Sequence, residues 1–382
     1  MVGRKVRSWS SRLAVILVVI GFQVVSSSRH SFAATVAELV KQAKKEGALN
    51  AMVITAITGK TTPQLATAFK KRFGLDIDVT LTPLLNTTEY PKAVAETKAG
   101  VVPTYDVLEG SDTNNIALLG VGGIHRVDGW ENLLREINPL VRAGRVKPEV
   151  LSHGPLRGNA FAYLSRTKAL LYNPRLITKD KLPKTHEQLA DPRYKGMWNQ
   201  PPWTTHWEPG PLVFPNISKD KWVEIVRKTG KNAGAVVVES AGVQRVLVGE
   251  HAFTMANTYY YFLYKAKDPQ APIDITYFQD FNVSSRAYYC VRKNAKHIAA
   301  GTLFAFWMAT PEAQAIWQPA NFYTQLWGES DLDKKEIKFI EDSGAKIVDF
   351  LDSEEGLAYL NWMSTEEGRK FKEAIGRAIR GE

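Results

Sequence analysis

The sequence contains a single cysteine, Cys290, among 382 residues. One thiol excludes an intramolecular disulfide and any metal cluster built from cysteines. A small secreted protein stapled by disulfides is therefore excluded, and stability must come from the hydrophobic core. With 45% hydrophobic and 23% charged residues, the chain has an ordinary globular composition and enough length for two lobes.

Sequence motifs of common enzyme classes are also missing. There is no Walker A loop, no H-E-x-x-H and no G-x-S-x-G, and "GVGG" at 120–123 lacks the rest of the dinucleotide fingerprint. The histidines beyond residue 33 do not follow metal-ligand spacing. A catalytic triad assembled in space would leave no such motif. We expect a protein that is not an enzyme and carries no cofactor.

Long apolar runs are absent apart from "LAVILVVIGFQVV" at 13–25, which follows a basic front and precedes "SFA" at 31–33. This pattern predicts a signal peptide over 1–33, cleaved after Ala33 or, alternatively, after Ala34. An uncleaved anchor is the other interpretation. Because no cysteine lies near the cleavage site, a lipid anchor is not expected, and we predict a free periplasmic protein.

The net positive charge of the mature chain is smaller than that of the full sequence. The segment 1–33 holds five of the 49 basic residues and no acidic residue, so the formal charge of +10 falls to +5 in the mature chain. That chain has no dense block of lysine and arginine. Nucleic-acid binding is therefore not expected.

The first third of the chain alternates between strand and helix patterns. Strands are predicted at 48–55, 77–83 and 105–110, and helices at 35–47, 61–74, in the second part of 86–100, and at 112–120. Such alternation predicts an α/β lobe with a mainly parallel sheet. Ligands of these sheets bind at the carboxyl ends of strands, which points to loops 56–60, 84–88 and 109–114.

The rest of the chain is more irregular until its helical end. Two extended runs are predicted within 158–174, an aromatic-rich loop at 203–213, a strand at 251–257 and two strands within 273–293. Helices are predicted at 220–230, 240–250, 296–310 and 365–381.

Consecutive tyrosines occur in "NTYYYFLYK" at 257–265. In a helix successive residues turn by ~100°, so three adjacent tyrosines cover too wide an arc to share one buried face. At least one phenol must face a cleft, a partner or water. Tyr261 and Tyr264 look like a packing pair, which leaves Tyr259 and Tyr260 as candidates for a cleft wall.

Several segments in order resemble one known family. They are "ATAFKKRFGLDIDV" (66–79), "AETKAGVVPTYDVLEGSD" (95–112), "TKALLYNPRLI" (167–177), "THEQLADPRYKGMW" (185–198) and "KHIAAGTLFAFWMATPEAQAIW" (296–317). Together they are similar to class II solute-binding proteins of ABC importers, in the branch that includes ferric-iron binders.

The resemblance implies an α/β fold of two lobes joined by two crossing strands, near 163–172 and 281–292, with a ligand cleft between the lobes. It implies a first lobe from 34–165, a second from 166–284, and a return to the first over 285–382 with the C-terminal helices. The implied role is capture of a solute for a permease in the inner membrane. We expect a periplasmic monomer.

The resemblance also implies ligands. "NTYY" (257–260) matches the paired tyrosines of ferric members, so Tyr259 and Tyr260 are candidate ligands of a transported Fe³⁺ held with a synergistic anion. The other candidates come from three loops at the positions of the family's ligand segments, where the residues depart from the family's pattern: Thr58 and Gly59, Ser111 and Asp112, and Trp203, Thr204, Thr205 and His206. His206 is a candidate metal ligand, with a structural role as the alternative. Ferric members often carry a histidine in the loop that here holds Thr58 and Gly59.

Other functions stay open. A small organic or phosphorylated anion would suit the same transport role, stacked on Trp203 and bound by Thr204, Thr205 and the tyrosines. An exported enzyme on a two-lobe fold is a less favoured alternative, as is a structural or adhesion protein, which fits a cleft-forming α/β pattern poorly.

Overall fold

The computed structural model describes residues 35–382, and the predicted signal peptide at 1–33 lies outside the described residues. The strands are β1 (Ala48–Ile54), β2 (Asp78–Leu84), β3 (Val107–Ser111), β4 (Ala160–Tyr172), β5 (Trp198–Gln200), β6 (Ala235–Val236), β7 (Phe253–Asn257), β8 (Asp274–Thr276), β9 (Asn282–Val291) and β10 (Ile347–Val348). They are linked in the order β2-β1-β3-β9-β4-β7-β5-β6, with β10 beside β9 and β8 beside β4.

Helices fill most of the connections between strands. The α-helices are α1 (Val36–Glu46), α2 (Thr61–Phe73), α3 (Asn86–Ala99), α4 (Asp112–Gly120), α5 (Trp130–Ile137), α6 (Pro139–Arg142), α7 (Pro148–Leu151), α8 (Gly210–Val213), α9 (Lys219–Asn232), α10 (Glu239–Leu247), α11 (Tyr259–Lys267), α12 (Ile298–Met308), α13 (Pro311–Asn321), α14 (Asp331–Ser343), α15 (Glu354–Met363) and α16 (Glu366–Ile379). Short 3-10 turns are η1 (Gly154–Leu156), η2 (Lys179–Lys181), η3 (Glu187–Ala190), η4 (Pro192–Tyr194) and η5 (Thr204–His206).

The first lobe starts as the predicted alternation of strand and helix. Thr35 caps α1 through a capping box with Glu38, and Gly47 ends that helix in the left-handed region at φ 75°. β1 pairs in parallel with β2 and with β3, which confirms the mainly parallel pattern of these strands. β9 then joins β3 antiparallel, with Val107 opposite Val291.

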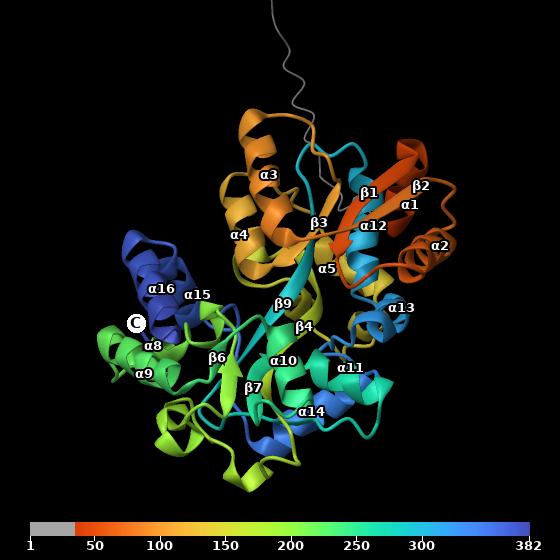
Figure 1. The fold of residues 1–382 in the computed structure, drawn as a ribbon. Coiled ribbons are helices and arrows are strands. Elements are labelled where there is room, and N and C mark those ends of the chain that lie inside the picture. The colour runs from red at the N-terminus through yellow and green to blue at the C-terminus, as the bar shows by residue number, and fades with distance from the viewer. Residues whose placement is uncertain (1–34) are drawn as a thin grey trace, which may run out of the picture. The chain divides into compact units, whose positions relative to one another are not determined.

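β4 and β9 are the two strands that connect the lobes. β9 pairs with β3 in the first lobe, and it pairs antiparallel with β4 from Ala160 opposite Cys290 to Thr167 opposite Ser284. β4 continues into the second lobe, where it pairs with β7 and β8. Figure 1 shows β9 running from the strands of the first lobe toward β7. Two crossing strands in one ladder therefore join the lobes.

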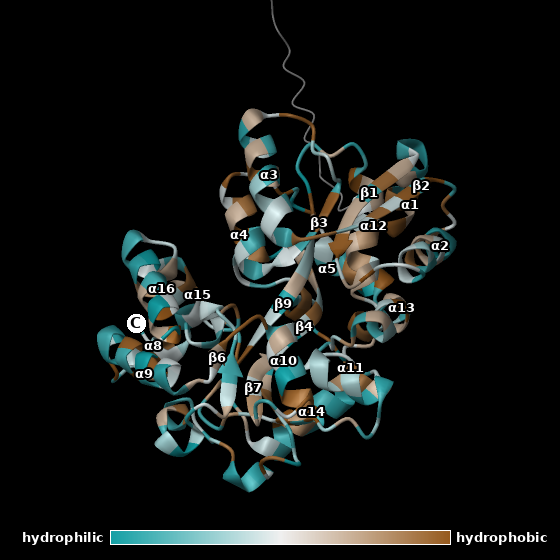
Figure 2. Ribbon diagram, viewed as in Figure 1, coloured by the Kyte–Doolittle hydropathy of each residue, from teal (hydrophilic) through white to brown (hydrophobic). Residues whose placement is uncertain are grey.

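The second lobe is built on β4, β7, β5 and β6, with β5 parallel to both of its neighbours. The C-terminal helix α16 lies against α9 of this lobe (Figure 1), and its Ile375 and Ile379 are fully buried in the lobe's apolar core. Figure 2 shows apolar residues along β1 and β3 and hydrophilic residues on α9.

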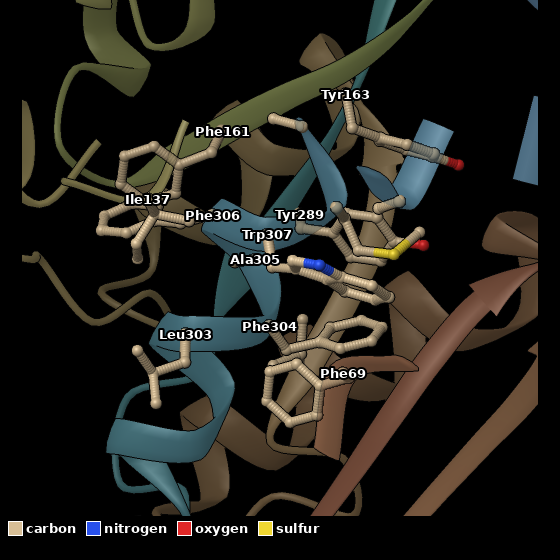
Figure 3. Close-up of a cluster of buried hydrophobic side chains, with 14 of the residues drawn as sticks. Phe69, Ile137, Phe161, Tyr163, Tyr289, Leu303, Phe304, Ala305, Phe306 and Trp307 are labelled. Carbon is tan, nitrogen blue, oxygen red and sulfur yellow. The ribbon is translucent and has the colours of Figure 1, made fainter. Parts of the chain in front are cut away.

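The core of the first lobe combines residues that are far apart in the sequence (Figure 3). Phe69 of α2 packs edge-on against Phe304 of α12, with ring centroids 5.4 Å apart, and Phe161 of β4 packs against Phe306 at 4.3 Å. These four rings are fully buried. Edge-to-face packing of this kind contributes beyond the burial of area, so α12 is held firmly against β4 and α2.

Two local expectations were wrong. The segment 158–174 forms one strand, β4, because its first half pairs with β9 and its second half with β7, and the irregularity is only a register shift between Ala162 and Leu164. α3 begins at Asn86, ahead of Pro91, because the amides of Thr88 and Glu89 donate to the Leu85 carbonyl and start the helix before the proline.

Within residues 35–382, no helix has the length and apolar character needed to cross a membrane.

Candidate functional site

A cavity of about 580 Å³ lies between the two lobes, and we call it the interlobe cavity. Its first-lobe wall comes from the carboxyl ends of the parallel strands β1, β2 and β3, as expected for such a sheet. Its second-lobe wall comes from the starts of α10 and α11, the segment before η5 and the crossing strands. The lining residues are Ile54, Thr55, Leu84, Leu85, Asn86, Thr87, Ser111, Asp112, Thr113, Arg166, Lys168, Trp203, Thr205, Glu208, Val238, Glu239, Ser240, Asn257, Tyr260, Val283, Ser284, Ser285, Tyr323, Phe350 and Leu360.

The structure brings half of the predicted site residues to this cavity. The five that line it are Ser111, Asp112, Trp203, Thr205 and Tyr260. Loops 84–88 and 109–114 both contribute, whereas the third predicted loop, 56–60, does not. Thr58 and Gly59 are exposed in the turn between β1 and α2, and the lining residues there are Ile54 and Thr55.

The remaining predicted residues stand behind the lining residues. Tyr259 packs on Tyr260, and His206 is buried in the second lobe. The Thr204 hydroxyl lies 2.6 Å from Oε1 of Glu208, to which it donates, so it is already used within the protein. Among the loop 203–206 only Trp203 and Thr205 therefore face the cavity.

Three tyrosines from two segments gather at the second-lobe wall. The rings of Tyr259 and Tyr260, at the start of α11, stack with centroids 4.1 Å apart. Tyr259 also packs against Tyr323, with centroids 4.6 Å apart, and Tyr323 lines the cavity with Tyr260. Burial raises the pKa of all three phenols and Glu239 adds to the rise, although the hydrogen bond with Tyr259 opposes it at Tyr260 and Arg166 opposes it at Tyr323, so without a cation the phenols are neutral.

The third tyrosine of the run points elsewhere. The Tyr261 ring packs edge-on against Phe339 of α14, with centroids 5.6 Å apart, in the hydrophobic cluster that also holds Phe262. The helical step of ~100° per residue separates it from the cavity side of α11. Tyr261 is thus a core residue and a suitable control for its neighbours.

Two basic side chains of β4 line the cavity, each paired with an acid. Nη2 of Arg166 lies 2.8 Å from Oε1 of Glu109, and Nζ of Lys168 lies 2.7 Å from Oε1 of Glu239. Burial raises the pKa of Glu109, although Arg166 opposes the rise. Burial would also raise that of Glu239, but Lys168 and His206 outweigh it and hold the pKa of Glu239 well below its usual range.

His206 does not reach the interlobe cavity. Its side chain is buried, its Nε2 lies 3.7 Å from Oε1 of Glu239, and it borders a void of only about 10 Å³ beside Lys168 and His186. Burial lowers the pKa of His206 to about 4, in spite of the nearby Glu239 carboxylate. The ring is neutral at pH 7 and occupies a structural position behind the wall.

Acidic and apolar groups complete the lining. Asp112 accepts a hydrogen bond from the Thr113 amide at 2.7 Å, and burial raises the pKa of its carboxyl group. Apolar side chains stay uncovered at Leu85, Trp203 and Val238, which are 58%, 45% and 47% exposed. The cavity therefore combines hydroxyls and charged groups with an apolar wall.

Sequence reasoning missed Arg166, Lys168, Tyr323 and the apolar wall. Arg166 and Lys168 fall within the predicted crossing strand near 163–172, so their charge in an otherwise apolar run was the available signal. Tyr323 follows α13 and is far from the other tyrosines in sequence. Leu84 and Leu85 belong to the loop predicted at 84–88, but they were not named as candidate site residues.

A second cluster of potential metal ligands includes Asp349, which directly precedes the lining residue Phe350. His153, Asp349 and Asp352 bring one ligand atom each within 4.8 Å of one another. The guanidinium of Arg286 binds the same two acids, with Nε 3.2 Å from Asp349 and Nη2 2.7 Å from Asp352. Because an arginine already supplies the positive charge, this cluster is an ion-pair network and not a metal site.

One family model and several solved structures match this chain. The family model described as "Bacterial extracellular solute-binding protein" matches residues 64–325. No curated protein sequence matches the chain.

Solved structures match over most of the described fold. Iron-bound HitA from Pseudomonas aeruginosa has a TM-score of 0.65 and 18% identity, covering 86% of this chain and 99% of that one. Trichodesmium IdiA (FutA) with iron and citrate has a TM-score of 0.63 and 17% identity, covering 87% and 99%. PotD, a spermidine/putrescine substrate-binding protein from Streptococcus pneumoniae, has a TM-score of 0.57 and 13% identity, covering 86% of this chain and 99% of that one. At these identities the likeness shows the fold, which is the two-lobe periplasmic-binding-protein fold.

Proposed function

Because the chain belongs to the family of bacterial extracellular solute-binding proteins, we propose that it is the solute-capturing component of an ABC importer, that it delivers its solute to a membrane permease, and that the solute is ferric iron bound with a small anion. The observation that supports iron as the solute is the cluster of Tyr259, Tyr260 and Tyr323. Tyr260 and Tyr323 line the interlobe cavity and Tyr259 packs against both.

Phenol oxygens suit this solute. Ferric iron is a hard cation that prefers anionic oxygen ligands, and a bound cation favours the phenolate over the phenol. The apo cluster is neutral because burial raises the pKa of each tyrosine. Iron would therefore have to displace phenol protons, so we expect uptake to weaken as the pH falls.

The basic groups of β4 support an accompanying anion. Arg166 and Lys168 face the cavity beside the hydroxyls of Thr205, Ser240 and Ser285. Both are already paired with buried acids, so they offer a partial positive field and hydrogen-bond donors. Such a field suits a carboxylate chelate of iron better than it suits a bare cation.

A visible-absorption titration of apo protein with ferric citrate tests the iron. Wild type should develop a tyrosinate-to-iron charge-transfer band, Tyr260→Phe should lose most of it, and Tyr261→Phe should keep it because Tyr261 packs against Phe339 in the core. A double variant, Tyr260→Phe with Tyr323→Phe, removes both phenols that line the cavity and should give no band. A colourless wild type that nevertheless binds citrate would remove iron from the proposal and leave solute capture standing.

A second candidate is a small organic or phosphorylated anion without iron, favoured by the presence of Arg166 and Lys168 in the wall. Calorimetric titration with iron-free anions decides between the two. A ligand that binds equally well to wild type and to the double tyrosine variant would favour the second candidate.

We propose the lobe boundaries 34–165 and 166–284, with 285–382 holding the return to the first lobe and the C-terminal helices, of which α16 packs in the core of the second lobe. We also propose a monomer that closes about the β4–β9 crossing. The continuous pairing of β4 with β9 and then with β7 supports this hinge. Small-angle scattering with and without ferric citrate measures the radius of gyration, which reports closure, and the molecular mass, which reports the oligomeric state. An unchanged radius of gyration on binding would argue against closure, and a mass of two chains would argue against the monomer.

A further inference from the structure

Exposed apolar side chains gather in the interlobe cavity. Large apolar residues that are well exposed within residues 35–382 are Leu85, Val101, Val102, Leu176, Trp203, Val238 and Val248. Three of these seven line the one cavity, namely Leu85, Trp203 and Val238. Leu84, Phe350 and Leu360 extend the same wall. An apolar surface shared by several segments at one cavity points to a ligand with an apolar part.

The three exposed residues belong to different segments. Leu85 precedes α3 at the carboxyl end of β2, Trp203 precedes η5, and Val238 precedes α10. Leu85 therefore comes from the first lobe and the other two come from the second. All three line the same cavity.

Trp203 differs from the tryptophans around it. Trp198 and Trp207 are completely buried in the core of the second lobe, whereas Trp203 is 45% exposed. Pro201 and Pro202 precede it, and proline fixes the backbone φ angle, so the indole is presented from a stiff segment. A tryptophan held outside the core on a rigid backbone and facing a cavity is placed to pack against a flat ligand.

Ferric citrate would leave most of this surface unused, because citrate has no aryl or other large apolar group beside its carboxylates, hydroxyl and methylenes. We propose that the solute contains a planar aryl group bearing adjacent oxygen donors, such as a catechol or hydroxybenzoate chelate. The aryl face packs on Trp203 between Leu85 and Val238, and its oxygens lie toward Tyr260 and Arg166. That the chelate contains iron depends on the proposed function, whereas the aryl subsite would bind the aryl group with or without iron.

Calorimetric titration with three probes tests the inference: ferric 2,3-dihydroxybenzoate, ferric citrate, and iron-free 2,3-dihydroxybenzoate. Wild type should bind the ferric aryl chelate about tenfold more tightly than ferric citrate. Trp203→Ala should lose about tenfold for the aryl chelate and stay within about twofold for ferric citrate. Leu176→Ala, which also removes an exposed apolar side chain but is not part of the cavity lining, is the matched control and should change neither.

Two results would overturn the aryl subsite. One is a wild type without preference for the aryl chelate. The other is an equal loss for both ferric complexes in Trp203→Ala, which would make Trp203 a contact of lobe closure. Circular dichroism of each variant verifies folding.

The outcomes also separate this inference from the proposed function. Ferric citrate binding with a charge-transfer band but no aryl preference removes the subsite and keeps the iron. Binding of iron-free 2,3-dihydroxybenzoate that Trp203→Ala weakens, with no iron band, keeps the subsite and removes the iron. Failure of all three probes overturns both.

Discussion

Nη2 of Arg166 lies 2.8 Å from Oε1 of Glu109, and the pair joins β4 to β3 across β9. Glu109 is completely buried, and its Oε2 has no hydrogen-bond partner within the described residues. A buried ion pair is weak evidence for stability, but loss of one partner leaves a buried charge uncompensated.

We therefore expect Arg166→Met to lower the free energy of unfolding by about 3 kcal/mol at pH 7. Burial raises the pKa of Glu109, so without Arg166 this carboxyl takes up a proton more readily and the loss should shrink as the pH falls toward 5. Urea denaturation measures both effects. The double variant with Glu109→Gln should recover much of the loss, and a double variant no more stable than Arg166→Met would contradict the pair's role.

A glycine next to this pair should not tolerate a methyl group. A Cβ on Gly110 of β3 would overlap the ring of Tyr90, which is buried and donates to Asn115 Oδ1 at 3.1 Å. Gly110→Ala should therefore cost about 1–3 kcal/mol through overpacking. Gly120→Ala is the control, because nothing lies within 4 Å of its Cβ position at the end of α4.

Thermal unfolding followed by circular dichroism compares the two variants. Gly110→Ala should melt several degrees below wild type, whereas Gly120→Ala should melt at or slightly above it. Equal melting temperatures would mean that Tyr90 moves aside without cost.

Acid should destabilise the apo protein through His206. Burial lowers the pKa of this ring to about 4, against ~6.5 for an unfolded histidine, so the unfolded chain takes up the proton first as the pH falls. The stability linked to His206 is complete above pH 6.5 and is lost below it, by about 2 kcal/mol between pH 7 and pH 5.

Urea denaturation of iron-free wild type and His206→Gln at both pH values isolates this contribution, because the other titrating groups are common to the two proteins. The variant should lose about 2 kcal/mol less than wild type over this range. Identical losses would show that His206 does not titrate between the folded and unfolded states as described.

Replacement of Arg286 should lower the free energy of unfolding more than replacement of a surface arginine. Its side chain is 12% exposed and binds Asp349 and Asp352 of the C-terminal segment, whereas that of Arg145 is 61% exposed and pairs with Glu329. Arg286→Met should cost about 3 kcal/mol. Arg145→Met should cost less than about 1 kcal/mol. Equal losses in urea denaturation would contradict this ranking.

Local signals predicted much of the fold. Thr35 and Gly47 marked both ends of α1, and the strands β1 and β2 lie within a residue of their predicted bounds, because caps and apolar alternation are local properties. β4 could not be predicted as one strand, because its length follows from three different partners along its course. Pairing between distant segments has no local signature.

The site was predicted where the sheet rule applied and missed where it did not. Ser111 is the last residue of β3 and Asp112 follows it, and both line the cavity, as the rule for strand ends requires. Thr58 and Gly59 also follow a strand, yet the chain turns away after Thr55. Arg166 and Tyr323 reach the cavity only through the crossing of β4 and the return of the chain after α13, which are tertiary features.

The first-lobe core has a consequence for how the chain folds as it is made. Phe69 of α2 packs against Phe304 of α12, and β3 pairs with β9. In each case the second partner is synthesised much later than the first. Until then an apolar helix face and a sheet edge stay without partners, the condition in which chains associate with one another. The N-terminal third should therefore need chaperones, or should fold only after α12 and β9 have been synthesised. A chain truncated before α12 should aggregate instead of forming a smaller lobe.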